Sequence, residues 1–166
     1  AAAKFIGEVD DESIQHRFDL LTRADMSRYG AAKSLNGKEH SEGGINLVLQ
    51  PDDFCGLLFY GVYGDKSTAN SSAYTFTAGS GGTDPDVHTW TEAADHLLPS
   101  FTMEVGREVK EHTYTGMCLT RLSLSAAVGE YVSISADFVG KAESASSTLN
   151  ASPTFVGGSV DGMHFK

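Results

Sequence analysis

The sequence predicts a single, mainly β domain, β-sandwich or barrel-like, with one flanking α-helix. Three features support this fold class. Short runs of alternating apolar and polar residues recur along the chain, Gly, Ser and Thr separate these runs, and one wide apolar stretch has helical spacing. The chain has 166 residues, of which 40% are hydrophobic and 20% charged, so residues 1–166 suit one domain with a single core.

The first predicted strands lie close to the N-terminus. The half-apolar segment 4–9 leads into an acidic run with Asp10, Asp11 and Glu12, which is predicted to be a solvated turn. Apolar and polar residues then alternate over residues 13–22, as in a half-buried strand. The apolar residues of this segment also match a helical spacing, so a helix remains the alternative.

Residues 24–44 show no sustained periodicity and contain several glycines together with spaced basic residues. They are therefore predicted to form a long loop. Loops longer than about 12 to 15 residues in compact domains are usually functional or disordered. This loop is a candidate contact between subunits, and a surface excursion without a partner is an equal alternative.

A strand over residues 45–50 and a helix over residues 51–63 are predicted next. Pro51 suits the first position of a helix, and the two aspartates that follow it favour the positive end of the helix dipole. The apolar residues after them form a wide helical face, and Gly64 is the predicted stop.

The middle of the chain is predicted to lie on the surface. Residues 65–91 are rich in Ser, Thr and Gly, with one short β-like run over residues 73–77. A helical turn over residues 91–96 and a strand over residues 100–105 follow. Here Phe101, Met103 and Val105 alternate with polar residues.

The clearest pattern is a hairpin near the end of the chain. Two alternating segments, residues 114–125 and 130–139, are joined by four turn-like residues, 126–129. The Ser- and Ala-rich segment 142–166 has few apolar residues. It is predicted to be flexible or to become ordered against a neighbouring molecule.

Composition argues against several classes of function. The formal net charge of −10 disfavours tight nucleic-acid binding, because phosphate contacts need Lys and Arg. No apolar run approaches the roughly 20 residues of a membrane helix, and the opening residues lack a secretion signal. Cys55 and Cys118 are predicted to be buried free thiols in a reducing compartment.

No catalytic, cofactor-binding or metal-binding residues are predicted. The six histidines are scattered without the spacing of metal ligands, and neither a nucleophile elbow nor a phosphate-binding loop is present. Paired carboxylates such as Glu108 and Glu111 fit solvated charge better than glycosidase chemistry. Trp90 and the tyrosines leave a lectin-like, carbohydrate-binding β-sandwich as the alternative to a structural protein, with a small hydrolase as a distant third.

Several segments, taken in order, resemble a bacteriophage tail tube protein family. They are GINLVLQPDDFCGLL (44–58), HTW (88–90), LPSFTME (98–104), YTGMC (114–118), LSLS (122–125) and VSISADFVGK (132–141). The resemblance implies a hexameric ring of β-sandwich subunits whose inner strands close into one continuous barrel. Stacked rings then form the tail tube, a conduit for the genome. Pairing of strand edges between subunits removes the hazard of open edges.

The resemblance also implies partners and a location. The protein is expected to bind copies of itself, the tape measure protein, the tail terminator and the distal tail protein, with no membrane and no cofactor. DNA is expected to pass transiently without specific binding. The location is the virion tail, after assembly in the host cytoplasm.

Two groups of residues are candidates for roles in the tube. Lumen-facing carboxylates, which would repel phosphate, are Asp19, Glu130 and Asp137. Arg17 and Arg121 lie on the same predicted strands, so a uniformly negative lining is not assured. Contacts between rings are predicted to join the basic residues Arg23, Arg28 and Lys33 of one copy to the acidic residues Asp10, Asp11 and Glu12 of another.

Overall fold

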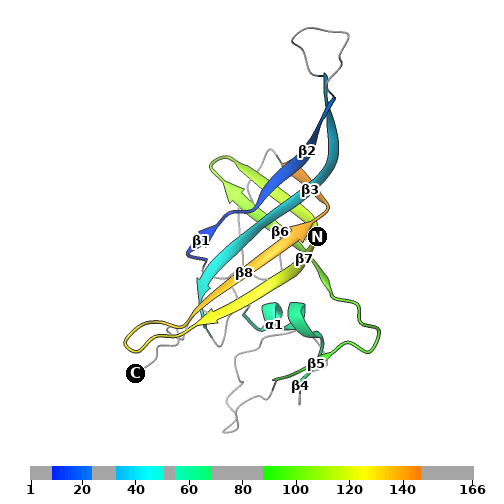
Figure 1. Ribbon diagram of the computed structural model, residues 1–166. Helices are drawn as coiled ribbons and strands as arrows, with labels where there is room; N and C mark the ends of the chain where they lie inside the picture. The colour runs from blue at the N-terminus through cyan, green and yellow to red at the C-terminus, as the bar shows by residue number, and fades with distance from the viewer. Residues whose placement is uncertain (1–8, 24–32, 51–54, 69–87, 147–166) are drawn as a thin grey trace.

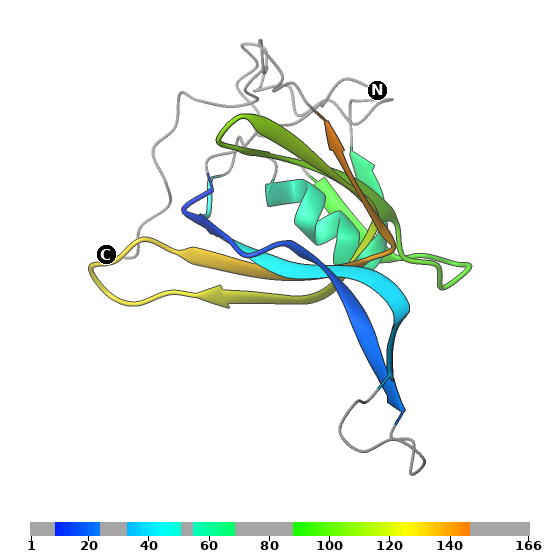
Figure 2. The same cartoon turned by 90° about the horizontal axis from the view of Figure 1, so that it is seen from above.

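The computed structural model describes residues 9–23, 33–50, 55–68 and 88–146. In this part of the chain most residues belong to strands, and a curled antiparallel sheet surrounds one helix (Figures 1 and 2). The mainly β class with one helix is thereby confirmed, and the β-rich architecture fits a sandwich. The predicted run 73–77, the first four residues of the predicted helix, residues 4–8 and the tail 147–166 lie outside the described residues.

The larger sheet has seven strands, each antiparallel to its neighbours. They are β1 (Asp11–Glu12), β2 (Gln15–Arg23), β3 (Lys33–Val48), β6 (Ser100–Arg107), β7 (Lys110–Ser125), β8 (Ser133–Gly140) and β9 (Ala142–Ser146). β1 and β2 both pair with β3, and the order then runs β3, β8, β7, β6. β9 follows β8 after one residue and pairs with the first part of β7.

A single helix and a small sheet complete the described fold. The helix α1 spans Cys55–Tyr63, and the two strands of the small sheet are β4 (Gly64–Thr68) and β5 (His88–Glu92). α1 lies inside the curl of the large sheet (Figure 2). The helix ends next to Gly64, as predicted.

The core lies between α1 and the inner face of the large sheet. Strand alternation places every second side chain on that face. On β8 these are Ile134, Ala136 and Phe138, each at most 3% exposed. The other members of the buried cluster are Ile14, Ile45, Leu47, Cys55, Leu58, Tyr114, Met117 and Leu119.

The strongest periodic patterns are confirmed. Residues 15–23 form β2 rather than a helix, residues 45–48 end β3, and β6 covers the predicted strand 100–105. β7 and β8 form the predicted antiparallel hairpin, although β8 begins at Ser133 instead of Glu130.

The prediction of a loop over residues 24–44 is wrong for residues 33–44, which form most of β3. The first half of this strand pairs only with β2, so neither of its faces needs an apolar pattern. A register shift between Phe18 and Leu20 also interrupts the alternation. Residues 24–32 lie outside the described part of the chain.

Three further predictions need correction. Residues 11–12 of the predicted solvated turn form β1, which pairs with β3. Residues 91–92 belong to β5, and only a turn follows at residues 94–95, so the helical turn over 91–96 is wrong. Residues 142–146 do not form a flexible or neighbour-docked tail, because they pair as β9 with β7 of the same chain. Backbone hydrogen bonds hold this strand, so it needs no apolar residues of its own.

Candidate assembly surfaces

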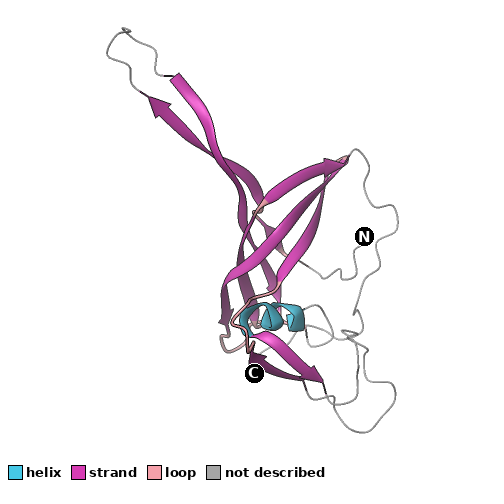
Figure 3. Cartoon of the chain, turned by 90° about the vertical axis from the view of Figure 1, so that its right-hand side faces the viewer, coloured by secondary structure: helices cyan, strands magenta, loops and turns pink. Residues whose placement is uncertain are grey.

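A two-stranded ribbon, the arm, projects from the body of the protein (Figures 1 and 3). It consists of residues 17–23 of β2 and residues 33–40 of β3. The pairing of β3 with β8 ends at Ser41 opposite Gly140, so the arm has no third strand among the described residues. A lone two-stranded hairpin is only marginally stable in water.

The arm exposes large apolar side chains. Leu21 and Leu35 are cross-strand partners with 61% and 71% of their surface exposed. Phe18 and Leu20 are also more than half exposed. Exposed large apolar side chains on a projecting element are typical of contact sites with another protein.

The outer end of the arm is basic. Arg23 is the last residue of β2 and lies opposite Lys33, the first residue of β3. Two of the three basic residues predicted to contact another ring therefore share this end. Arg28, the third, lies outside the described residues.

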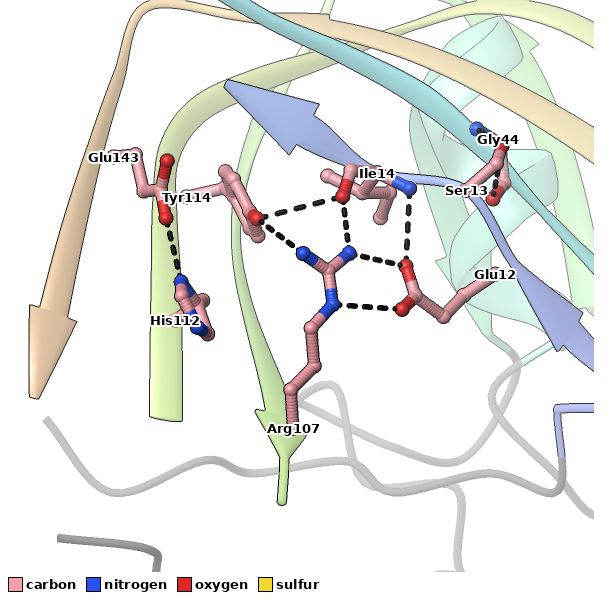
Figure 4. Close-up of polar contacts among 8 residues, drawn as sticks. All are labelled: Glu12, Ser13, Ile14, Gly44, Arg107, His112, Tyr114 and Glu143. Atoms are coloured by element: carbon pink, nitrogen blue, oxygen red, sulfur yellow. Dashed lines mark hydrogen bonds and ion pairs between the residues drawn. The ribbon is translucent and has the colours of Figure 1, made fainter. Parts of the chain in front are cut away.

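Arg107 on β6 bridges two distant parts of the sheet, and its contacts form a cluster that we call the clasp (Figure 4). Its Nε donates to Glu12 Oε1 at 3.0 Å and its Nη2 donates to Glu12 Oε2 at 2.9 Å. The same guanidinium donates to the backbone oxygen of Ile14 and, at 3.3 Å, to Tyr114 Oη. The clasp joins the β1–β2 edge of the curled sheet to β6 and β7.

The clasp also shifts the ionisation of its members. The hydrogen bonds from Arg107 hold the pKa of Glu12 below its usual value, assisted by the backbone N–H of Ile14. Hydrogen bonding to Glu12 in turn raises the pKa of Arg107. Burial raises the pKa of the Tyr114 hydroxyl. Glu12 and Arg107 are therefore both charged at neutral pH.

Glu12 was predicted to contact another ring, but the clasp engages it within its own chain. Its side chain is 30% exposed, and both carboxylate oxygens accept hydrogen bonds from Arg107. Asp10 and Asp11, next to it, are exposed. The clasp itself has no sequence signal, because Arg107 and Glu12 are 95 residues apart.

A second side-chain contact secures β9 beside the clasp (Figure 4). His112 Nδ1 lies 2.5 Å from Glu143 Oε1, and both side chains are largely buried. The imidazole stacks on the Tyr114 ring with centroids 6.5 Å apart. This contact fixes the C-terminal strand to β7.

The face of the large sheet turned away from α1, which we call the outer face, carries two ion pairs. Arg17 Nε lies 3.0 Å from Glu42 Oε1, and Arg121 Nε lies 2.7 Å from Asp137 Oδ2. A shallow hollow of about 410 Å³ over Gly43 and Gly44 is bordered by Arg17, Glu42 and Asp137. The sequence indicates that the two arginines lie on these strands, but it gives no sign that Glu42 is a partner.

The three predicted lumen-facing carboxylates lie on different elements. Asp137 lies on the outer face of β8, Asp19 is exposed on the arm, and Glu130 is exposed in the turn between β7 and β8. Asp137 is paired with Arg121, whereas Asp19 and Glu130 form no ion pair with the described residues. The structure therefore does not gather the three carboxylates into one cluster.

The described residues give little support to a sugar-binding surface or a metal site. The Trp90 ring, which had suggested a sugar-binding surface, packs against Phe59 of α1 with centroids 5.2 Å apart. The described residues contain no group of three His, Cys, Asp or Glu side chains placed to bind a metal. No helix among them is long and apolar enough to cross a membrane. Cys55 is buried, but Cys118 is only half-buried.

Comparison with known proteins places this architecture in a family. No curated protein matches the sequence significantly. A family model described as phage tail tube protein matches residues 7–163, which is nearly the whole chain and includes the arm, the clasp and the outer face. The chain therefore belongs to the phage tail tube protein family, whose members have a structural role in the virion tail.

Proposed function

We propose that copies of this protein form hexameric rings that stack into the tail tube, the conduit through which the genome leaves the virion. The arm is the single observation that best supports this proposal, because it is a two-stranded ribbon with large apolar side chains that the described residues of one chain leave exposed. In a tail tube, another subunit of the same protein would cover these exposed apolar residues.

Open strand edges also support a ring. Among the described strands, β6 pairs only with β7, while β1 and β2 pair only with β3. The clasp joins these two edges through the Arg107 side chain, not through a ladder of backbone hydrogen bonds. Open edges invite pairing with another chain, and rotational symmetry closes such contacts without leaving an edge. In the proposed ring the strands of neighbouring subunits continue one another into an inner barrel.

The arm is the proposed contact between rings. Its basic end, with Arg23 and Lys33, would approach Asp10 and Asp11 of a copy in the next ring, while its apolar residues supply the buried area. Arg28 is proposed to take part in the same contact between rings. Exposed charge pairs contribute little energy and mainly set register. Glu12 has no part in this contact because Arg107 occupies it.

The remaining partners follow from a tube in a virion tail. The tape measure protein would fill the lumen during assembly, and the tail terminator and distal tail protein would bind the two ends. DNA would pass through without specific binding. Assembly would take place in the host cytoplasm, with no cofactor and no membrane.

Replacing Leu21 and Leu35 with lysine is expected to abolish tubes and to leave the subunit folded. Both side chains are mostly exposed in the single chain, so the substitutions should cost the subunit little folding stability. A contact between copies at this site, in contrast, would have to bury the two lysine charges. Negative-stain electron microscopy measures the tubes, and circular dichroism measures the fold.

The matched control replaces the same two leucines with methionine, which keeps the apolar surface and should preserve tubes. Tubes of normal length from the lysine variant would contradict the role of the arm. Wild-type protein that remains a monomer at high concentration in size-exclusion chromatography would contradict the proposed function as a whole, and a compact glycan-binding oligomer would favour the lectin alternative.

A further inference from the structure

We propose that Glu42 and Asp137 act as charge masks, each neutralising an arginine on the outer face so that passing DNA does not bind there. The inference rests on the proposed function, with the outer face turned toward the lumen. It differs from general acidic repulsion, because what matters is the pairing of each carboxylate with an arginine.

The Arg121–Asp137 pair is held by the backbone around it. Asp137 lies directly opposite both Arg121 and Gly44 in the sheet. A Cβ atom on Gly44 would lie 2.6 Å from Asp137 Oδ1, so a larger residue at position 44 would push the carboxylate from this position. Two guanidinium nitrogens of Arg121 contact the same oxygen, Asp137 Oδ2, each at 2.7 Å.

The Arg17–Glu42 pair lies on the other side of the same hollow. Arg17 belongs to β2 and Glu42 to β3, and their contact is a diagonal one across the two strands. Between the two pairs lie Gly43 and Gly44, which add no side chain to the surface. The hollow is thus bordered by Arg17 and by both carboxylates, and Asp137 in turn pairs with Arg121.

Stability does not explain these pairs. The Arg17 and Arg121 side chains are 53% and 72% exposed, and exposed ion pairs contribute little to folding. Arginine is, however, the side chain best suited to bind phosphate, because its planar fork can donate two hydrogen bonds at once. An unpaired arginine repeated in every subunit of a tube would contact many phosphates along one duplex.

The proposal is tested with full-length protein carrying Glu42→Gln and Asp137→Asn, which preserve side-chain shape and unmask both arginines. Binding of a short fluorescent DNA duplex is measured by anisotropy, before and after assembly, at low and raised salt. We expect the variant to bind at least about tenfold more tightly than wild type at low salt. The slope of log affinity against log salt should steepen by about 0.9 for each added phosphate contact.

The matched control carries Asp19→Asn and Glu130→Gln, which change the net charge equally but remove carboxylates that form no ion pair with the described residues. We expect this control to bind DNA as weakly as wild type. Adding Arg17→Gln and Arg121→Gln to the unmasked variant should abolish the gain.

No gain in DNA affinity in the Glu42→Gln and Asp137→Asn variant would contradict the proposal. An equal gain in the Asp19 and Glu130 control would also contradict it and would favour general repulsion of DNA by acidic residues. Persistence of the gain without the two arginines does the same. Negative-stain images of the same samples report on tube formation separately, so a failure of the proposed function is distinguished from a failure of the masks.

Discussion

Replacing Gly43 with alanine is expected to cost about 3 to 5 kcal/mol of the free energy of unfolding, a large part of the roughly 5 to 15 kcal/mol of a typical domain. Gly43 has φ +148°, a conformation that side-chain-bearing residues rarely adopt. Its Cβ would lie 2.4 Å from the Ser13 oxygen and 2.5 Å from Ile14 Cα. Both contacts are backbone atoms, so no side-chain rotation relieves them.

The damage would spread from β3 to the connection between β1 and β2. Ser13 N donates to the Gly44 oxygen at 2.9 Å, and Gly44 N donates to Ser13 Oγ at 3.0 Å. Displacing this connection breaks both bonds, moves the buried Ile14 and pulls Glu12 away from Arg107. Urea unfolding followed by circular dichroism measures the loss.

Gly129→Ala is the matched control for this substitution. Gly129 also has a positive φ, +83°, but a Cβ there would meet nothing within 4 Å. Its expected cost is about 1 kcal/mol, from backbone conformation alone. Equal losses in the two variants would show that the close approach at Gly43 has no energetic importance.

Breaking the clasp with Arg107→Leu is expected to destabilise the fold by about 1 to 2 kcal/mol at neutral pH. The substitution leaves the Glu12 carboxylate without its bidentate donor and removes a donor from Tyr114 Oη and the Ile14 oxygen. The value lies in the lower part of the range for charged hydrogen bonds because both side chains are about one third exposed to water. Urea unfolding provides the measurement.

The contribution of the clasp should depend on pH in one direction. The pKa of Glu12 is lower in the folded protein than the ordinary value of a glutamate, so the stabilisation is fully present above that ordinary value. It is lost as the pH falls through the lower, folded-state pKa. Glu12→Gln should therefore be less stable than wild type at pH 7, and the difference should shrink on acidification.

Other ionisable groups near the clasp also affect the pKa values of its members. His112 lowers the pKa of Glu12, while Glu143 and Glu12 raise the pKa of Tyr114.

Arg121→Leu is the control for Arg107→Leu, because the exposed Arg121–Asp137 pair should contribute no more than about 0.5 kcal/mol to the free energy of unfolding. A constant difference between wild type and Glu12→Gln at all pH values would contradict the electrostatic origin of the effect.

The local pattern of apolar residues was sufficient to predict a helix or strand where one face of that element is buried over its whole length. β8 shows this well: Ile134, Ala136 and Phe138 recur with the period of a strand because each contacts the core. The body of α1 and its end beside Gly64 were predictable for the same reason. The order of these segments also sufficed to indicate the tail tube family.

Local patterns failed where pairing, not burial, holds the strand. The first half of β3 and all of β9 are defined by backbone hydrogen bonds to β2 and β7, and such bonds leave no mark on the order of apolar residues. A loop and a flexible tail were therefore predicted in places where strands exist.

The amino-acid sequence alone thus determined the strand-rich fold class, the helix, the β7–β8 hairpin and the family. Tertiary structure alone decided that the arm projects, that Arg107 binds Glu12, and that Glu42 and Asp137 each face an arginine. These contacts join residues on different strands, far apart along the chain in most cases. Only the register and curl of the sheet bring them within hydrogen-bonding distance.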